Sequence, residues 1–216
     1  MQQAGYEEVS IHTPIGNTSR ALIKLADDEE VDLILLASHR KGFLKRTLLG
    51  STTFEMAHAV EVPLLINKDD EEEENVNLLE TVLVPTDFSR KSLEALNIIR
   101  TLREFVGKVL FVHVIEHSRN KHDYKEKYGS AMLFLKELVD EMKIFGIEAD
   151  YRISHGVASK KISAICDRDD VSMIMMTKTG ADMTNGDELG STSEHLVLNS
   201  DCAIMLLPAE DPDDEE

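Results

Sequence analysis

Residues Ser172–Asn199 read SMIMMTKTGADMTNGDELGSTSEHLVLN and predict a strand, a glycine-bounded loop and a helix in turn. Ser172–Thr177 is a short, mostly apolar run of the kind that forms a buried strand. Gly180 follows this strand, and Gly190 precedes Thr192–Asn199, which has the apolar spacing of a helix. A strand followed by a loop and a helix is the repeating unit of an α/β protein.

The same alternation extends on both sides of this stretch. Four further strands are predicted at Thr81–Pro85, Val109–Val114, Glu148–Ile153 and Ala203–Leu207. Helical spacing is found after Ser89, across Met132–Met142 up to Gly146, and at Ser159–Cys166. The pattern predicts an α/β fold with a five-stranded parallel sheet covered by helices on both faces.

An internal repeat relates the start of the chain to its end at an offset of 140 residues. Gly16-Asn17-Thr18-Ser19 aligns with Gly156-Val157-Ala158-Ser159, and Gly50-Ser51-Thr52 with Gly190-Ser191-Thr192. Matching glycines at one offset without a gap indicate two copies of one fold. For the first copy this predicts a strand, helix, strand, helix and strand at Val9–His12, Ser19–Asp27, Asp32–Ala37, Thr52–His58 and Pro63–Ile66.

The first copy therefore lacks the counterpart of the amino-terminal half of the second. A parallel sheet without its central strand would leave apolar edges unpaired. We expect that the chain is part of a longer protein or that a partner fills the gap, and a misplaced start of the sequence is the alternative.

Two acidic blocks, at 69–74 and 210–216, divide the chain. Runs of like charge repel one another and stay extended. We predict a partial domain at 1–68, an acidic linker at 69–78, a complete domain at 79–209 and an acidic tail at 210–216. The alternative for an acidic block is a docking segment for a basic partner.

The composition excludes several classes of protein. The chain has 216 residues, with 41 acidic against 23 basic side chains and a formal net charge of −18. Nucleic acid and anionic lipid are therefore poor candidate partners, because binding phosphate polymers needs a basic face. No apolar run is long enough to form a membrane-spanning helix, so no membrane insertion is predicted, and the first residues of the sequence do not resemble a secretory signal. Cys166 and Cys202 form no metal-ligand or disulfide pattern, so a cytoplasmic protein is predicted.

The candidate phosphate-binding residues lie at the end of one strand and the start of the next helix. Gly180 closes a strand where a parallel sheet presents its ligand crevice. Gly190 and Ser191 open a helix, whose free N–H groups and positive dipole end suit an anion. The hydroxyls of Thr192 and Ser193 add donors. The alternative is that these residues only shape a strand end and cap a helix.

A carboxylate candidate follows the first strand of the second copy, in Pro85-Thr86-Asp87. It lies at the same edge of the sheet, where it could accept a hydrogen bond from an adenine amino group or a ribose hydroxyl. His113 and His155 are also expected near the crevice, but neither has a nucleophile partner in the sequence. No catalytic residue and no metal site is predicted.

These motifs resemble those of the universal stress protein family. Its nucleotide-binding members carry Gly-x-x-Gly-x9-Gly-(Ser/Thr) and an aspartate after strand one, where this sequence has Thr177-x-x-Gly180-x9-Gly190-Ser191 and Asp87. The first copy keeps only Gly50-Ser51 of the motif. The predicted nucleotide-binding residues are Pro85, Thr86, Asp87, Val112, Gly156, Met176, Thr177, Thr179, Gly180, Gly190, Ser191, Thr192 and Ser193.

The resemblance implies an adenine nucleotide alpha hydrolase-like sheet of strand order 3-2-1-4-5 and self-association through the strand-five edges, Pro63–Ile66 and Ala203–Leu207. It also implies ATP as a ligand. Thr177 departs from the motif, however, and the loop after Gly180 carries Asp182, Asp187 and Glu188 and no basic residue. A triphosphate beside these carboxylates would need Mg²⁺.

The sequence thus predicts a regulatory module of stress response or signalling that acts by binding a ligand or a partner. Two alternatives remain. One is an ATP-binding protein with slow hydrolysis in the second domain. The other is a ligand-free dimerisation scaffold or the cytosolic regulatory part of a transporter.

Overall fold

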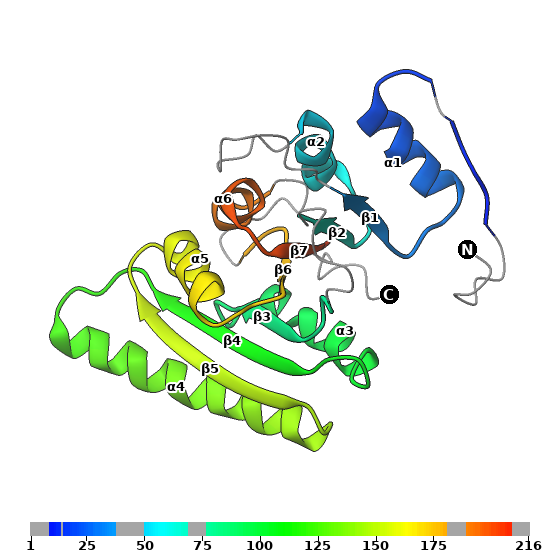
Figure 1. The fold of residues 1–216 in the computed structure, drawn as a ribbon. Coiled ribbons are helices and arrows are strands. Elements are labelled where there is room, and N and C mark those ends of the chain that lie inside the picture. The colour runs from blue at the N-terminus through cyan, green and yellow to red at the C-terminus, as the bar shows by residue number, and fades with distance from the viewer. Residues whose placement is uncertain (1–8, 14, 38–49, 69–76, 181–188, 209–216) are drawn as a thin grey trace, which may run out of the picture.

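The computed structural model describes residues 9–13, 15–37, 50–68, 77–180 and 189–208. Their strands form one seven-stranded sheet in the order β1-β2-β7-β6-β3-β4-β5, with helices on both faces (Figure 1). The predicted linker at 69–78 and tail at 210–216 lie largely outside the described residues. Within the described part of the chain, no helix is long and apolar enough to cross a membrane.

The second copy contributes the five strands that the sequence predicts, all parallel and in the expected order 3-2-1-4-5. The strands are β3 (Thr81–Pro85), β4 (Lys108–Ile115), β5 (Glu148–His155), β6 (Met173–Thr177) and β7 (Ala203–Leu207). The helices are the 3₁₀ turn η1 (Lys91–Leu93), α3 (Ala95–Thr101), α4 (Lys121–Ile144), α5 (Ala158–Arg168) and α6 (Ser191–Asn199). The predicted α/β fold is therefore confirmed.

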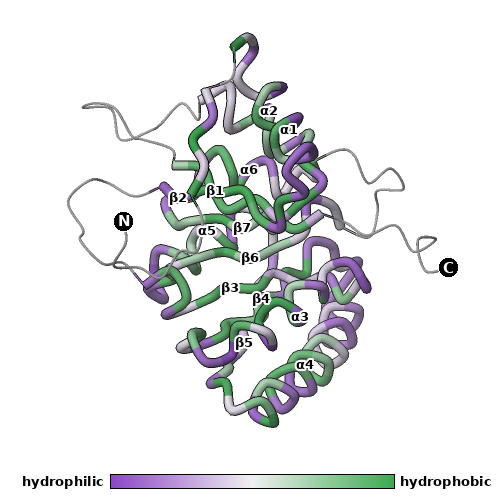
Figure 2. Tube along the Cα trace, turned by 90° about the vertical axis from the view of Figure 1, so that its right-hand side faces the viewer, coloured by the Kyte–Doolittle hydropathy of each residue, from purple (hydrophilic) through white to green (hydrophobic). Residues whose placement is uncertain are grey.

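The sheet is buried on both faces because successive residues of its strands point to opposite sides. On β6, Ile174 and Met176 pack with α5 and α6, whereas Met173 and Met175 pack with α3 and α4. Apolar strands therefore run through the centre of the molecule, and polar residues gather on the outer side of the helices (Figure 2). This burial explains why the strands are continuous apolar runs rather than alternating ones.

The first copy adds two strands to the same sheet. Its elements are α1 (Thr18–Asp28), β1 (Ile34–Ala37), α2 (Ser51–Ala59) and β2 (Leu64–Asn67), and α1 lies against α2. The predicted strand at Val9–His12 is wrong, since the described residues 9–13 are irregular. A strand needs a neighbour to satisfy its backbone, and the described part of the first copy offers no counterpart of β4 to pair with it.

The two copies are joined edge to edge by their last strands. β2 pairs with β7 in antiparallel orientation, with Leu64 opposite Leu206 and Ile66 opposite Ile204. All four of these side chains are fully buried. The two predicted strand-five edges therefore pair with each other within one chain.

Two buried lysines, one from each copy, donate hydrogen bonds across the seam between the copies, which is the β2–β7 pairing. Lys68, just after β2, donates hydrogen bonds to the carbonyls of Val197 and Ser200 at the end of α6, at 2.6 and 2.8 Å. Lys178, just after β6, donates to the carbonyls of His58 and Val60 at the end of α2, at 2.7 and 2.9 Å. Each ammonium satisfies terminal carbonyls of a helix in the other copy and sits at the negative end of its dipole.

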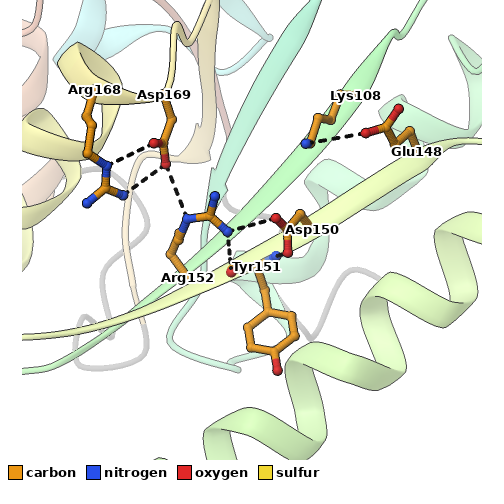
Figure 3. Close-up of polar contacts among 7 residues, drawn as sticks. All are labelled: Lys108, Glu148, Asp150, Tyr151, Arg152, Arg168 and Asp169. Carbon is orange, nitrogen blue, oxygen red and sulfur yellow. Dashed lines mark hydrogen bonds and ion pairs between the residues drawn. The ribbon is translucent and has the colours of Figure 1, made fainter.

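The two outer strands of the sheet differ in character. β5 carries Glu148, Asp150 and Arg152, which are tied into ion pairs that cross to β4 and α5 (Figure 3). Charges on an edge strand oppose pairing with another sheet. β1 has none, and its Leu35 is 62% exposed, although the repeat aligns it with Met175, which is fully buried.

Replacing Lys68 with methionine should lower the free energy of unfolding by about 2 kcal/mol, because the buried carbonyls at the end of α6 lose their donor. Urea unfolding at pH 7 measures this. Lys136→Met on the exposed face of α4 is the matched control and should change the midpoint little. An unchanged midpoint for Lys68→Met would contradict the proposed role of the seam lysines.

Arg152→Leu tests the β5 edge. The Arg152 guanidinium holds the pKa of Asp150 below its usual value. The ion pair therefore contributes its full stabilisation when the pH is above the ordinary carboxyl pKa of about 4. This stabilisation is lost as the pH falls through the lowered pKa of Asp150. We expect NMR titration to show a raised pKa for Asp150. The variant should lose less than about 1 kcal/mol at pH 7, and this difference should vanish in strong acid. Lys143→Leu, which removes an ion pair on α4, should leave the Asp150 titration unchanged.

Candidate functional site

A cavity of about 350 Å³ opens at the carboxyl ends of β3, β4 and β6, against the amino-terminal ends of α5 and α6. This is where loops of a parallel sheet converge on a ligand. All of the predicted site residues except Gly156 line it. They are Pro85, Thr86, Asp87, Val112, Met176, Thr177, Thr179, Gly180, Gly190, Ser191, Thr192 and Ser193.

Gly156 is the predicted site residue that the structure does not bring to the cavity. It lies in the turn between β5 and α5 at a φ of 124°, a conformation that favours glycine. The requirement for glycine is thus conformational, and Ala158, two residues later, lines the cavity instead. His155 lines a different, more open hollow beside Glu116 and Ser118.

Sequence reasoning missed several lining residues. They are Ser92, Val114, Glu116, Ala158 and Ile162, while His113 lines the cavity as expected. Glu116 follows β4 directly, so its place after a strand end was a signal equivalent to that of Asp87. Ser92 and Ile162 lie within helical turns, where neither spacing nor type separates a lining residue from a core residue.

The loop after β3 is held in a defined shape by its own side chains. The Thr86 hydroxyl accepts a hydrogen bond from the Phe88 N–H at 2.9 Å, and Phe88 takes a φ of 66°. Asp87 Oδ1 accepts from the N–H and the hydroxyl of Ser89, at 3.0 and 2.6 Å. The Asp87 carboxylate is therefore oriented by Ser89 within this turn.

Both glycines of the motif lie where another part of the chain approaches closely. A Cβ on Gly180 would lie 3.0 Å from Asp87 Oδ2, so the loops after β3 and β6 meet at this point. A Cβ on Gly190 would lie 3.2 Å from the Lys178 carbonyl, which accepts the Gly190 N–H at 2.8 Å. The glycines thus let two strand-end loops and the start of α6 close around one space.

The amino-terminal end of α6 presents donors without acceptors. Gly190 caps the helix without a side-chain hydrogen bond, and the first helical bond is from the Glu194 N–H to the Gly190 carbonyl. The N–H groups of Ser191, Thr192 and Ser193 have no acceptor among the described residues. Beside them, the Thr179 hydroxyl is buried, with 1% exposure of the residue, and has no hydrogen-bond partner within the described structure. A buried hydroxyl left without a partner is costly and indicates that a ligand or water completes it.

His113 forms the wall on the β4 side. Its Nδ1 lies 2.8 Å from the Thr86 carbonyl, and because a carbonyl only accepts, Nδ1 carries the proton. Whenever the ring carries a single proton, Nε2 is therefore its acceptor nitrogen. Phe88 stacks on this imidazole at a centroid distance of 4.3 Å and on Phe134 at 5.1 Å, which fixes the plane of the ring.

The charges that line the cavity are those of carboxylates. Asp87 and Glu116 line it, and neither lysine nor arginine is among its described lining residues. Glu116 Oε1 accepts the Ala158 N–H at 2.7 Å and so occupies the start of α5. The described residues contain no cluster of three or more side chains suited to hold a metal ion.

Comparison with known proteins places this architecture. The model of the universal stress protein family matches residues 1–68 and 79–208. The chain belongs to the universal stress protein family. One such protein from Methanocaldococcus jannaschii is 24% identical over 144 residues, which are 61% of this chain and 83% of the relative. A second from the same archaeon is 39% identical over 54 residues, or 25% of this chain and 33% of the relative.

Solved structures extend the likeness to both copies. A universal stress protein from Archaeoglobus fulgidus has a TM-score of 0.74 and 27% identity, covering 94% of this chain and 71% of that chain. The universal stress protein UspA from Lactobacillus plantarum has a TM-score of 0.53 and 14% identity, covering 60% of this chain and 97% of that chain. The latter likeness concerns the fold alone.

In the first copy, the corresponding helix start is Gly50-Ser51 at α2, again without a side-chain cap. The basic loop of this copy, Arg40 to Arg46, lies outside the described residues. Among the described residues, the first copy has no counterpart of the Asp87 loop. Within the part of the chain that the structure describes, both halves of the site come together in the second copy alone.

Gly180→Ala should destabilise the protein by about 1 kcal/mol, because the new methyl group meets the Asp87 carboxylate. Gly129→Ala is the matched control. Gly129 lies inside α4 with open space around its Cα, so alanine should stabilise the helix by about 1 kcal/mol. Thermal unfolding of both variants measures the change in stability, which should be a loss for Gly180→Ala and a gain for Gly129→Ala. Equal effects would show that the Asp87–Gly180 approach is not constraining.

Proposed function

We propose that the second copy binds an adenine nucleotide and that this universal stress protein acts as a stress-related regulatory module. The observation that carries the proposal is the unpartnered Thr179 hydroxyl beside the free N–H groups of α6. Such a group of donors at a helix start suits a phosphate. Membership of the universal stress protein family supports the ligand-binding, regulatory part of the proposal.

The lining of the cavity offers more than one kind of chemistry. The start of α6 supplies N–H groups and hydroxyls for a phosphate, from Ser191, Thr192 and Ser193. Val112, Met176 and other apolar side chains supply a surface against which the base would pack. Asp87, oriented by Ser89, would accept from a ribose hydroxyl or an adenine amino group.

Binding rather than catalysis is the proposed mechanism. His113 has one nitrogen committed to the Thr86 carbonyl and the other available as an acceptor, but no side-chain hydrogen bond links it to a nucleophile among the described residues. Slow hydrolysis of ATP is the second candidate and would require Mg²⁺ to offset Asp87 and Glu116. A ligand-free scaffold is the third, favoured by the β2–β7 pairing that joins the copies.

We also propose that the chain divides into domains at 1–68 and 79–209. Separate matches of the family model to 1–68 and 79–208 support this division. The shared sheet implies that the two domains unfold together rather than one by one.

The test is isothermal titration of ATP with Mg²⁺, and of AMP, into the full chain, beside intact mass spectrometry for carried nucleotide. One site per chain supports the proposal. Thr179→Val keeps the shape of the side chain and removes the unpartnered hydroxyl, so it should weaken binding about fivefold while stability stays equal or rises.

Thr101→Val on α3 is the control, since its hydroxyl bonds only to the Asn97 carbonyl in its own helix. It should leave binding unchanged. No heat with either nucleotide, and no co-purified ligand, would refute nucleotide binding and favour the scaffold.

A further inference from the structure

The site that the proposed function rests on lacks the charges that a polyphosphate needs. Proteins that hold triphosphates use lysine, arginine or a metal ion against the outer phosphates. The described lining residues of this cavity include two carboxylates, Asp87 and Glu116, and one imidazole, His113, but no lysine or arginine. Glu194 adds a further carboxylate in the first turn of α6.

The lysine nearest in sequence to the phosphate-binding groups is committed elsewhere. Lys178 precedes Thr179, but it is buried and its ammonium donates to the carbonyls of His58 and Val60 in the first copy. Its charge is thus matched by the end of α2.

The remaining phosphate-binding groups are neutral and few. The N–H groups of Ser191, Thr192 and Ser193 and the hydroxyl of Thr179 lie at one helix start, whose dipole supplies about half a positive charge. Together they match the oxygens of a single phosphate group. Each additional phosphate would bring negative charge toward Asp87 and Glu116, no lysine or arginine is among the described lining residues to receive it, and like charges in a partly desolvated site repel.

We propose, on the basis of the nucleotide site above, that this cavity selects nucleoside monophosphates over di- and triphosphates. The protein would then respond to the level of the product of nucleotide consumption rather than to that of ATP. Selection arises from missing cations, so it should grow with the number of phosphates and shrink as salt screens the carboxylates.

The test is titration of AMP, ADP and ATP into the full chain at fixed ionic strength, each with and without Mg²⁺. We expect affinity to fall in that order, with ATP about tenfold or more weaker than AMP in the absence of Mg²⁺. Raising the salt should narrow the gap. ATP binding as tightly as AMP, or more tightly in either condition, would overturn the selection while leaving nucleotide binding intact. Failure of all three nucleotides to bind would instead overturn the proposed function itself.

The Glu116→Gln variant tests whether the charge of this carboxylate causes the preference for monophosphates. Glutamine keeps an oxygen that can accept the Ala158 N–H, so the start of α5 stays capped, but the charge is gone. ATP affinity should rise about threefold or more, with a smaller change for AMP. Glu137→Gln on the exposed face of α4 changes the net charge equally and should alter neither. If Glu116→Gln leaves the AMP-to-ATP ratio unchanged, charge repulsion at this carboxylate is not the basis of selection.

Discussion

The antiparallel pairing of β2 with β7 is the interaction on which the rest of the structure depends. It turns two copies into one sheet and places the end of each copy's last helix within reach of a lysine from the other. A buried ammonium is tolerated only when carbonyls or carboxylates receive it. Lys178 therefore ties the backbone that carries Thr179 and Gly180 to the end of α2, so the first copy, although it holds only half of a site, supports the site of the second.

The two edge strands of the sheet, β5 and β1, differ in their charges and in the exposure of their apolar side chains. At β5, Arg152 bridges Asp150 and Asp169, and these charges make pairing with a further strand unfavourable (Figure 3). At β1, the residues have the apolar character of β6, yet Leu35 is exposed where its counterpart Met175 is buried. The difference follows from what lies beside each strand, since β6 has β3 as its neighbour and β1, among the described strands, has only β2.

The cavity gains its character from neutral donors rather than from cations. Helix-start N–H groups and hydroxyls hold an anion at low cost in desolvation because their dipoles are already aligned. The carboxylates of Asp87 and Glu116 also line the cavity, and Glu116 accepts an N–H at the start of α5. In the proposed nucleotide site, the choice of ligand would therefore depend on the placement of these two acidic side chains.

The sequence by itself determined the alternation of strands and helices, the repeat at an offset of 140 residues and the pairing of Gly180 with Gly190, because periodicity and glycine positions are local properties. The strand order of the second copy followed from the resemblance to the universal stress protein family, and most of the residues that line the cavity could be predicted, although Ser92, Val114, Glu116, Ala158 and Ile162 were missed. Tertiary structure decided the rest. Val9–His12 is not a strand, and the described part of the chain offers it no partner strand, while Gly156 serves its turn rather than the cavity. The hydrogen bond of Glu116 to the start of α5 and the reach of Lys178 to α2 join residues far apart in the chain, and no local pattern records such contacts.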